Sequence, residues 1–189
     1  VYVARTGYTG EDGFEVVAPA EVIAPIWRAL TEAGAPFGLK PAGLGARDTL
    51  RTEMGYPLYG HELTEATTPI EAGLAFFVVL DKGDFVGRDV LLRQKAEGVS
   101  KRCAAFRMAD KSPPPRPDYV VWSADPAAAP IGKVVSGTQS PSLGVGIGMA
   151  YVQPAMAQPG TSVAIEIRGR RFPAGIEKKP LYRRPAARP

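Results

Sequence analysis

Charged side chains that could bind or transform a ligand are concentrated in two short runs near the start of the chain. The first run, residues 5–16, reads R-T-G-Y-T-G-E-D-G-F-E-V. The second run covers residues 38–63, and four of its charged residues lie within seven positions: Arg47, Asp48, Arg51 and Glu53. Charged groups at this density, beside glycines and tyrosines, indicate a polar pocket more than a solvated face.

Glu11 is the main binding candidate in the first run. It lies at the tip of a glycine-flanked loop, beside Asp12, where backbone can approach a ligand closely. A carboxylate in such a position can accept two parallel N–H hydrogen bonds from a planar heterocycle. Spacing alone explains Glu11 more readily as a solvated loop tip or a helix cap.

Arg47 is the candidate in the second run. It lies on a helix predicted over Ala42–Met54, whose apolar face is thin, and its guanidinium could bind a carboxylate or orient Glu11. Arg51 follows four residues later, so both arginines are expected to project from one side of the helix. An ordinary ion pair, within the helix or to another element, is the simpler explanation of Arg47. The Arg47-Asp48 order makes Asp48 the structural member of the two.

Other catalytic signatures are missing from the sequence. It has no paired His/Cys set for a metal and no G-x-S-x-G elbow, so we predict no metal site and assign no catalytic residue. The glycine-rich runs at residues 7–13 and 143–148 lack the spacing or context of a phosphate loop. His61, the only histidine, has no spaced partner and is expected to be structural.

Composition places the chain among ordinary globular proteins. Of its 189 residues, 45% are hydrophobic and 22% charged, which is enough to bury a core. No apolar run reaches the roughly 18 residues of a membrane helix, and no secretory signal opens the chain. The single cysteine, Cys103, reads as a small buried hydrophobe. We therefore expect a cytoplasmic protein, or one of the mitochondrial matrix if the source is eukaryotic.

Positive charge is concentrated at the end of the chain. The net charge is +4, and five arginines and two lysines follow Arg168, against one acid, Glu177. Such a tail favours an acidic partner, or it is simply solvated. No aromatic interleaving or nucleic-acid-binding module accompanies it, so we expect no nucleic-acid partner.

The first half of the sequence predicts an α+β segment. Two strands joined by a loop at residues 6–13 precede a helix, a second helix, a strand and a third helix. These elements are expected at Val1–Arg5, Phe14–Ala18, Ala20–Ala33, Ala42–Met54, Leu74–Leu80 and Gly87–Glu97. Because the chain starts at Val1 inside a strand pattern, we expect it to be a fragment.

From residue 101 the pattern changes to short Val- and Ile-rich runs between turn signals, which is typical of an antiparallel barrel. The strands are expected at Arg102–Met108, Tyr119–Trp122, Ile131–Ser136, Leu143–Tyr151, Ser162–Arg168 and Arg170–Glu177. Arg168-Gly169-Arg170 reads as a tight hairpin. We predict two domains: an incomplete α+β ligand-binding segment at 1–99 and a β-barrel at 100–189.

Several of these runs resemble the glycine cleavage T-protein family, the tetrahydrofolate-dependent aminomethyltransferases. The matching runs are R-T-G-Y-T-G-E-D-G-F-E-V, G-L-G-A-R-D-T-L-R, G-Y-P-L-Y-G-H-E-L, T-P-I-E-A-G-L, D-F-V-G-R-D-V-L, G-K-V-V-S-G-T-Q-S-P-S-L and K-P-L-Y-R-R. They occur in the family's order over nearly the whole chain. The resemblance implies the C-terminal part of such a protein, with the first segment forming the second half of a ferredoxin-like layer.

The resemblance also implies roles for individual residues. Glu11 matches the glutamate that binds the folate, and Arg47 matches the folate-binding arginine of the A-R-D motif. Tyr182 aligns with an aromatic that reaches the same pocket, and Tyr8 is a candidate stacking wall. The catalytic acid beside folate N10 lies in the N-terminal half of the family, so we expect this chain alone to be inactive.

By resemblance, the reaction moves a one-carbon unit from an aminomethyl-lipoyl carrier, the H-protein, to tetrahydrofolate and releases ammonia. Two alternatives stay open. One is the tail of a folate-linked N-methyl amine dehydrogenase or demethylase. The other is a non-catalytic folate-binding or scaffold protein. The sequence upstream would distinguish them, since a flavin-binding domain there would indicate the dehydrogenase.

Overall fold

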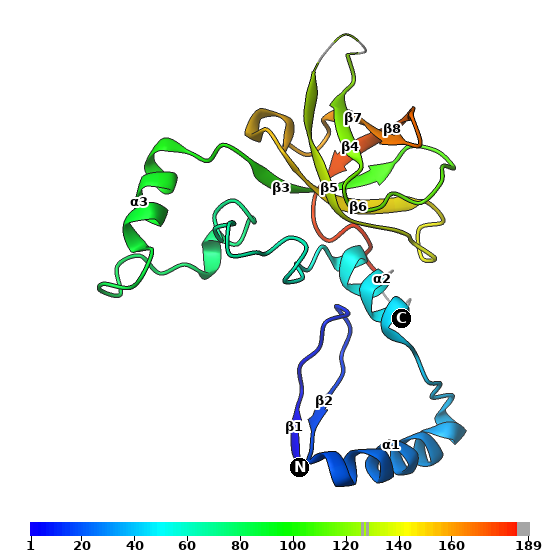
Figure 1. Cartoon of the computed structure of the whole chain (residues 1–189). Helices are drawn as coiled ribbons and strands as arrows, with labels where there is room; N and C mark the ends of the chain where they lie inside the picture. The colour runs from blue at the N-terminus through cyan, green and yellow to red at the C-terminus, as the bar shows by residue number, and fades with distance from the viewer. Residues whose placement is uncertain (126, 128, 185–189) are drawn as a thin grey trace, which may run out of the picture. The chain divides into compact units, whose positions relative to one another are not determined.

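The computed structural model describes residues 1–125, 127 and 129–184. The chain forms two compact units, Val1–Arg51 (the N-terminal unit) and Thr52–Pro189 (the barrel unit). The predicted α+β class with a C-terminal antiparallel barrel is confirmed (Figure 1). The predicted domain boundary at residue 99 differs from this division and stays a prediction.

Six strands close the barrel of the second unit. In chain order they are β3 (Arg102–Met108), β4 (Val120–Ser123), β5 (Pro130–Gln139), β6 (Gly146–Val152), β7 (Ser162–Ile167) and β8 (Arg170–Glu177). Around the barrel the order is β3-β6-β5-β4-β7-β8, and β8 pairs with β3 to close it. All of these pairings are antiparallel. Closure leaves no unpaired sheet edge.

The strands carry apolar residues at alternating positions, and these residues form the core around which the barrel closes. Every second residue of β3 and β7 is apolar and faces one common cluster, the barrel core. Its buried members are Ala104, Phe106, Met108, Val121, Ile131, Val134, Ala150, Val152, Val163, Ile165, Ile167, Ala174 and Ile176. The predicted tight hairpin between β7 and β8 is confirmed: Arg168 and Gly169 have φ of 52° and 77°, as a two-residue type I′ turn requires.

A second apolar cluster lies on the other face of β3 and β6. Its buried members are Cys103, Ala105, Ile147, Met149 and Leu181. Cys103 is therefore a buried small hydrophobe, as its surroundings predict. Leu181 comes from the segment after β8, so this cluster fastens the end of the described chain to the barrel.

The segment before the barrel is largely irregular. Its one long helix is α3, Arg88–Glu97, which lies between Gly87 and Gly98. The strand predicted over Leu74–Leu80 is wrong: the structure has a 3-10 turn at Ala75–Phe77. Its amides bond locally, with the N–H of Phe77 donating to the carbonyl of Leu74. A strand needs a ladder partner, and local turns satisfied these groups instead.

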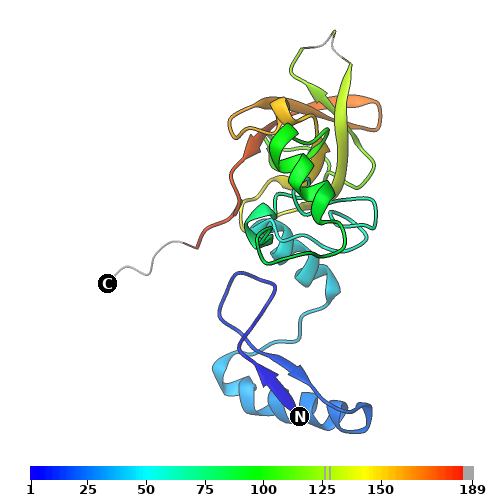
Figure 2. The ribbon, with the colours of Figure 1, turned by 90° about the vertical axis from the view of Figure 1, so that its left-hand side faces the viewer.

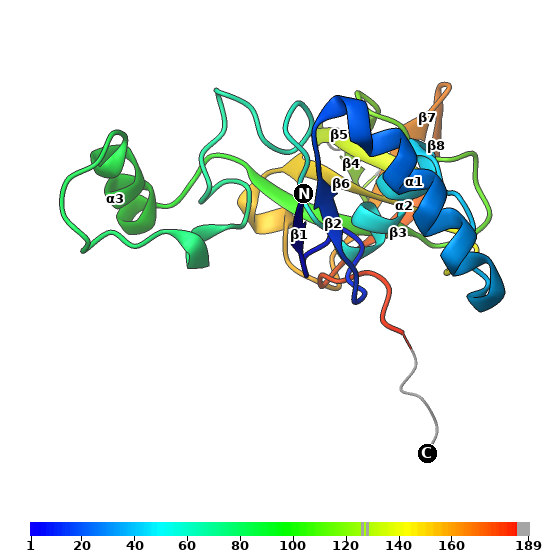
Figure 3. The same cartoon turned by 90° about the horizontal axis from the view of Figure 1, so that it is seen from below.

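The N-terminal unit contains a two-stranded sheet and a helix. β1 (Tyr2–Ala4) pairs antiparallel with β2 (Glu15–Val17), and a long loop joins them (Figure 2). Helix α1, Ala20–Gly34, follows as one continuous element (Figure 3). A 3-10 turn at Ala35–Phe37 comes next. Helix α2, Leu44–Met54, then begins in this unit and ends in the barrel unit.

The apolar stripe predicted for α1 exists but is not covered within the described residues. Helix α1 has no buried residue, and the exposed fractions of Trp27 and Leu30 are 55% and 52%. In the described part of the chain, no helix combines the length and apolar character that crossing a membrane requires.

Candidate functional site

The loop between β1 and β2 carries two neighbouring carboxylates with different surroundings. Arg5 donates two hydrogen bonds to Asp12, Nε to Oδ1 at 2.8 Å and a terminal nitrogen to Oδ2 at 2.9 Å. This bidentate pair lowers the pKa of Asp12 below its ordinary value. Glu11 lies beside it on the exposed tip, next to Gly10, whose φ of +73° makes the turn. Asp12 thus has a structural role in the loop, and Glu11 is the second exposed carboxylate of this tip.

Two of the predicted binding residues contact each other. The guanidinium carbon of Arg47 lies 4.6 Å from the centre of the Tyr8 ring, a cation–π contact. Tyr8 belongs to the same loop as Glu11, and Arg47 belongs to the first half of α2. The structure therefore brings a tyrosine and an arginine, 39 positions apart in the sequence, into one surface of the N-terminal unit.

Asp48 pairs with Arg51 rather than with its neighbour Arg47. A terminal nitrogen of Arg51 lies 2.7 Å from Oδ1 of Asp48, and Nε donates to the same oxygen at 2.8 Å. Asp48 is therefore the structural member, as expected. Arg47 is exposed and Arg51 is fully buried, so the two arginines have different surroundings despite their four-residue spacing.

Tyr182 belongs to the barrel unit, in the segment after β8. Its backbone N–H donates to the carbonyl oxygen of Glu53 at 3.1 Å, and the neighbouring Leu181 N–H donates to the same oxygen at 2.8 Å. The Tyr182 side chain is half-buried, and Leu181 is buried. Sequence reasoning missed this anchor, because a backbone carbonyl carries no residue-type signal and its partners lie far away in the sequence.

His61 and Glu62 have structural roles in the barrel unit. His61 Nδ1 lies 3.0 Å from the carbonyl oxygen of Val135 on β5, so this nitrogen carries the proton. Glu62 is fully buried, and one of its carboxylate oxygens accepts the Leu58 N–H at 2.9 Å. The Tyr151 hydroxyl donates to the Glu62 carbonyl at 2.8 Å, and burial raises the pKa of Tyr151. These contacts give both residues of the G-H-E-L motif structural partners in the barrel unit.

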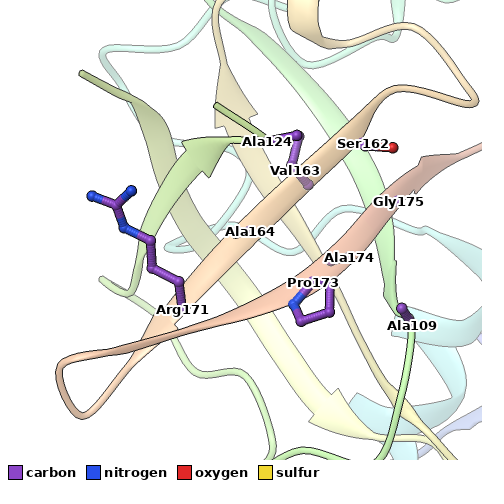
Figure 4. A pocket seen from close by; sticks show the side chains of 9 residues that line it. All are labelled: Ala109, Ala124, Ser162, Val163, Ala164, Arg171, Pro173, Ala174 and Gly175. Atoms are coloured by element: carbon purple, nitrogen blue, oxygen red, sulfur yellow. The ribbon is translucent and has the colours of Figure 1, made fainter. Parts of the chain in front are cut away.

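A hollow of about 410 Å³ lies on the barrel, along β7 and β8 (Figure 4). Small residues line most of it, including Ala109, Ala124, Ala164 and Gly175, and Arg171 is its charged residue. None of the predicted binding residues lines this hollow. Among the described residues, no group of three or more His, Cys, Asp or Glu side chains could hold a metal ion.

Comparison with known families gives matches to both parts of the chain. A family model described as the GCVT N-terminal domain matches residues 1–82. Another, described as the glycine cleavage T-protein C-terminal barrel domain, matches residues 101–183. The second match coincides with the closed barrel.

Curated relatives carry the name aminomethyltransferase. The proteins of Thermoanaerobacter sp. (strain X514) and Bacillus pumilus are each 47% identical to this chain, over 96% and 97% of its length. The matched regions are 48% and 50% of those proteins. The chain thus spans about half the length of the curated relatives it matches.

A solved structure has the same fold. The crystal structure of glycine cleavage system aminomethyltransferase T from Bartonella henselae superposes with a TM-score of 0.87 at 32% identity. The match covers 95% of this chain and 49% of that one.

Proposed function

We propose, from the chain's membership of the glycine cleavage T-protein family as a C-terminal portion, that it forms part of a tetrahydrofolate-dependent aminomethyltransferase. The whole protein would take a one-carbon unit from the aminomethyl-lipoyl arm of the H-protein. It would pass this unit to tetrahydrofolate and release ammonia. Tetrahydrofolate is then the acceptor substrate, the H-protein is the protein partner, and the cytoplasm is the expected location.

In this proposal the N-terminal unit grips the folate. Glu11 accepts two N–H bonds from the donor edge of the pterin ring, since an exposed carboxylate on a glycine turn can receive a flat heterocycle edge-on. Arg47 contributes a cation, and Tyr8 contributes a ring face. The observation that carries this assignment is the 4.6 Å contact between Arg47 and Tyr8, because Tyr8 lies in the loop that presents Glu11. By resemblance, Tyr182 is also assigned to folate binding.

The chemistry then depends mainly on proximity. Holding a folate nitrogen against the transferred carbon converts an encounter between two molecules into a reaction within one complex. One carboxylate assists proton movement, and we assign it to the half of the family that this chain does not span. The residues of this chain bind and orient, so we expect the chain alone to bind folate weakly and to have no turnover.

The same pocket could serve a folate-linked enzyme that acts on N-methyl amines. The curated relatives favour the aminomethyltransferase, because the proteins of Thermoanaerobacter sp. and Bacillus pumilus carry that name at 47% identity.

Turnover provides the test. This chain would be co-produced with the half of the Bacillus pumilus relative that it does not cover, and ammonia release would be measured with aminomethylated H-protein. We expect release that depends on tetrahydrofolate and on both halves. Turnover with an N-methyl amine in place of the H-protein, or full activity of the 189 residues alone, would contradict the proposal.

A further inference from the structure

Glu53 connects three separate parts of the barrel unit. It is the second-last residue of α2, and its exposed fraction is 2%. Its side chain reaches the loop between β5 and β6, where Oε1 accepts the hydroxyl of Ser140 and Oε2 accepts the hydroxyl of Ser142 at 3.0 Å. The Ser142 N–H adds a longer contact of 3.4 Å. A buried carboxylate needs such donors, because burial without them is costly.

The loop that Glu53 binds is itself ordered by the same serine. Ser140 is fully buried, and its hydroxyl oxygen accepts the N–H of Leu143 at 3.0 Å. Its backbone carbonyl accepts the N–H of Gly144 at 2.9 Å. The Glu53 carboxylate therefore binds a loop that has hydrogen bonds of its own, and these contacts tie the last turn of α2 to that loop.

The backbone of Glu53 binds the segment that carries Tyr182. Its carbonyl oxygen accepts the N–H groups of both Leu181 and Tyr182, at 2.8 and 3.1 Å. Two residues later, Gly55 lies against the same segment: a Cβ built at Gly55 would be 2.7 Å from Cδ of Lys179. The position of Tyr182 therefore depends on where the end of α2 is held, and the Glu53 side chain holds it.

We propose that Glu53 is a positioning residue for the folate site: by fastening the end of α2 to the β5–β6 loop, it fixes the backbone from which Tyr182 projects. This inference rests on the proposed function, in which Tyr182 contacts the folate. Glu53 itself touches no substrate. Its effect on the ligand passes through Tyr182.

Hydrogen exchange tests the positioning step without any ligand. In Glu53→Gln the amide nitrogen cannot accept a serine hydroxyl, so one charge-assisted bond is lost. We expect the Leu181 and Tyr182 amides of the 189-residue chain to exchange about tenfold faster or more. Ser142→Ala, which removes one donor from a partly buried site, should give a smaller change in the same direction. Glu97→Gln, at an exposed carboxylate on α3, is the matched control and should change nothing.

Binding of tetrahydrofolate tests the second step. The chain would be complemented with the missing half of a curated relative, and Kd would be measured for Glu53→Gln, Tyr182→Ala and the double variant. If Glu53 acts through Tyr182, the double variant should bind no more weakly than Tyr182→Ala alone, because the two losses are then coupled.

The outcomes are distinguishable. Unchanged exchange at Leu181 and Tyr182 in both Glu53→Gln and Ser142→Ala would overturn the positioning role, whatever the folate does. Additive losses of affinity would overturn it as well. A third outcome combines faster exchange in Glu53→Gln with unchanged folate affinity in Tyr182→Ala. This outcome would support the Glu53 anchor but contradict the folate-binding role of Tyr182 in the proposed function.

Discussion

At the scale of single residues, the β1–β2 loop carries two neighbouring carboxylates, Glu11 and Asp12, and an arginine of the same loop region binds Asp12. Arg5 binds both carboxylate oxygens of Asp12, and this pair joins the two sides of the loop. Glu11 directly precedes Asp12 in the chain and is exposed. The Arg5–Asp12 pair therefore holds one side of the loop tip that carries Glu11.

The titration of Asp12 follows from this pair. Its pKa is lowered in the folded chain by the hydrogen bonds from Arg5. The stabilisation is therefore present above the unfolded pKa of about 3.9 and is lost as pH falls through the lower folded value. We expect Arg5→Gln to raise the Asp12 pKa toward about 3.9. An NMR titration of the side-chain carboxyl measures it.

Arg28→Gln, which removes a cation from α1, is the control for that titration and should leave the Asp12 curve in place. An Asp12 pKa that is the same in Arg5→Gln as in the unsubstituted chain would show that the ion pair does not persist in solution.

At the scale of elements, glycines allow the barrel strands to approach closely. A Cβ built at Gly148 on β6 would lie 2.3 Å from the Ser136 carbonyl oxygen and 2.6 Å from Cζ of Phe106. Gly175 on β8 differs, because no atom lies within 4 Å of its built Cβ. A glycine-to-alanine substitution should therefore be destabilising on β6 and nearly neutral on β8.

We expect Gly148→Ala to lower the free energy of unfolding by about 1–3 kcal/mol or more, since backbone cannot move away from the added methyl group. Gly175→Ala should stay within about 0.5 kcal/mol of the unsubstituted chain. Urea unfolding followed by circular dichroism compares them. Equal stabilities for the two variants would contradict the packing described for β6.

The strands that could be predicted from sequence are those in which the apolar pattern covers the same residues as the strand pairing. Strand β3 was predicted with both bounds correct, because its alternating residues face two different apolar clusters. Strand β5 is longer than predicted: Gly137 and Gln139 carry no strand signal, but pairing with Gly148 and Gly146 of β6 extends it. Residues 74–80 were predicted as a strand but contain a 3-10 turn instead. Their apolar content suggested a strand, but no partner strand among the described residues pairs with them.

At the scale of the whole molecule, burial is very uneven. None of the buried apolar side chains of the described residues lies in Val1–Arg51. The N-terminal unit has three-residue strands, and α1 presents Trp27 and Leu30 to solvent. The barrel unit holds both apolar clusters. The stability of the chain must therefore come mainly from the barrel.

Hydrogen exchange of the whole chain should separate the two units. We expect amides of β1, β2 and α1 to exchange by local opening, and amides of β3, β6 and β7 to exchange only on global unfolding. Mass spectrometry of peptides at several urea concentrations makes the comparison. Equal protection of α1 and β7 would contradict this ranking.

Part of the candidate site could be predicted, and part could not. Tyr8, Glu11 and Arg47 stood out because their motifs are dense and match a family. The anchor at Glu53 did not, because it depends on Ser140, Ser142 and Leu181, which are far from it in the sequence and come together only when the barrel closes.

The most direct test of the central claim, that Glu11 helps to grip a folate, is calorimetric titration of tetrahydrofolate into this chain complemented with the half it does not span. Glu11→Gln loses the anionic acceptor, so its affinity should fall by about tenfold or more. Glu21→Gln, at an exposed carboxylate on α1, should bind like the unsubstituted protein. Equal affinity in all three proteins would contradict the claim.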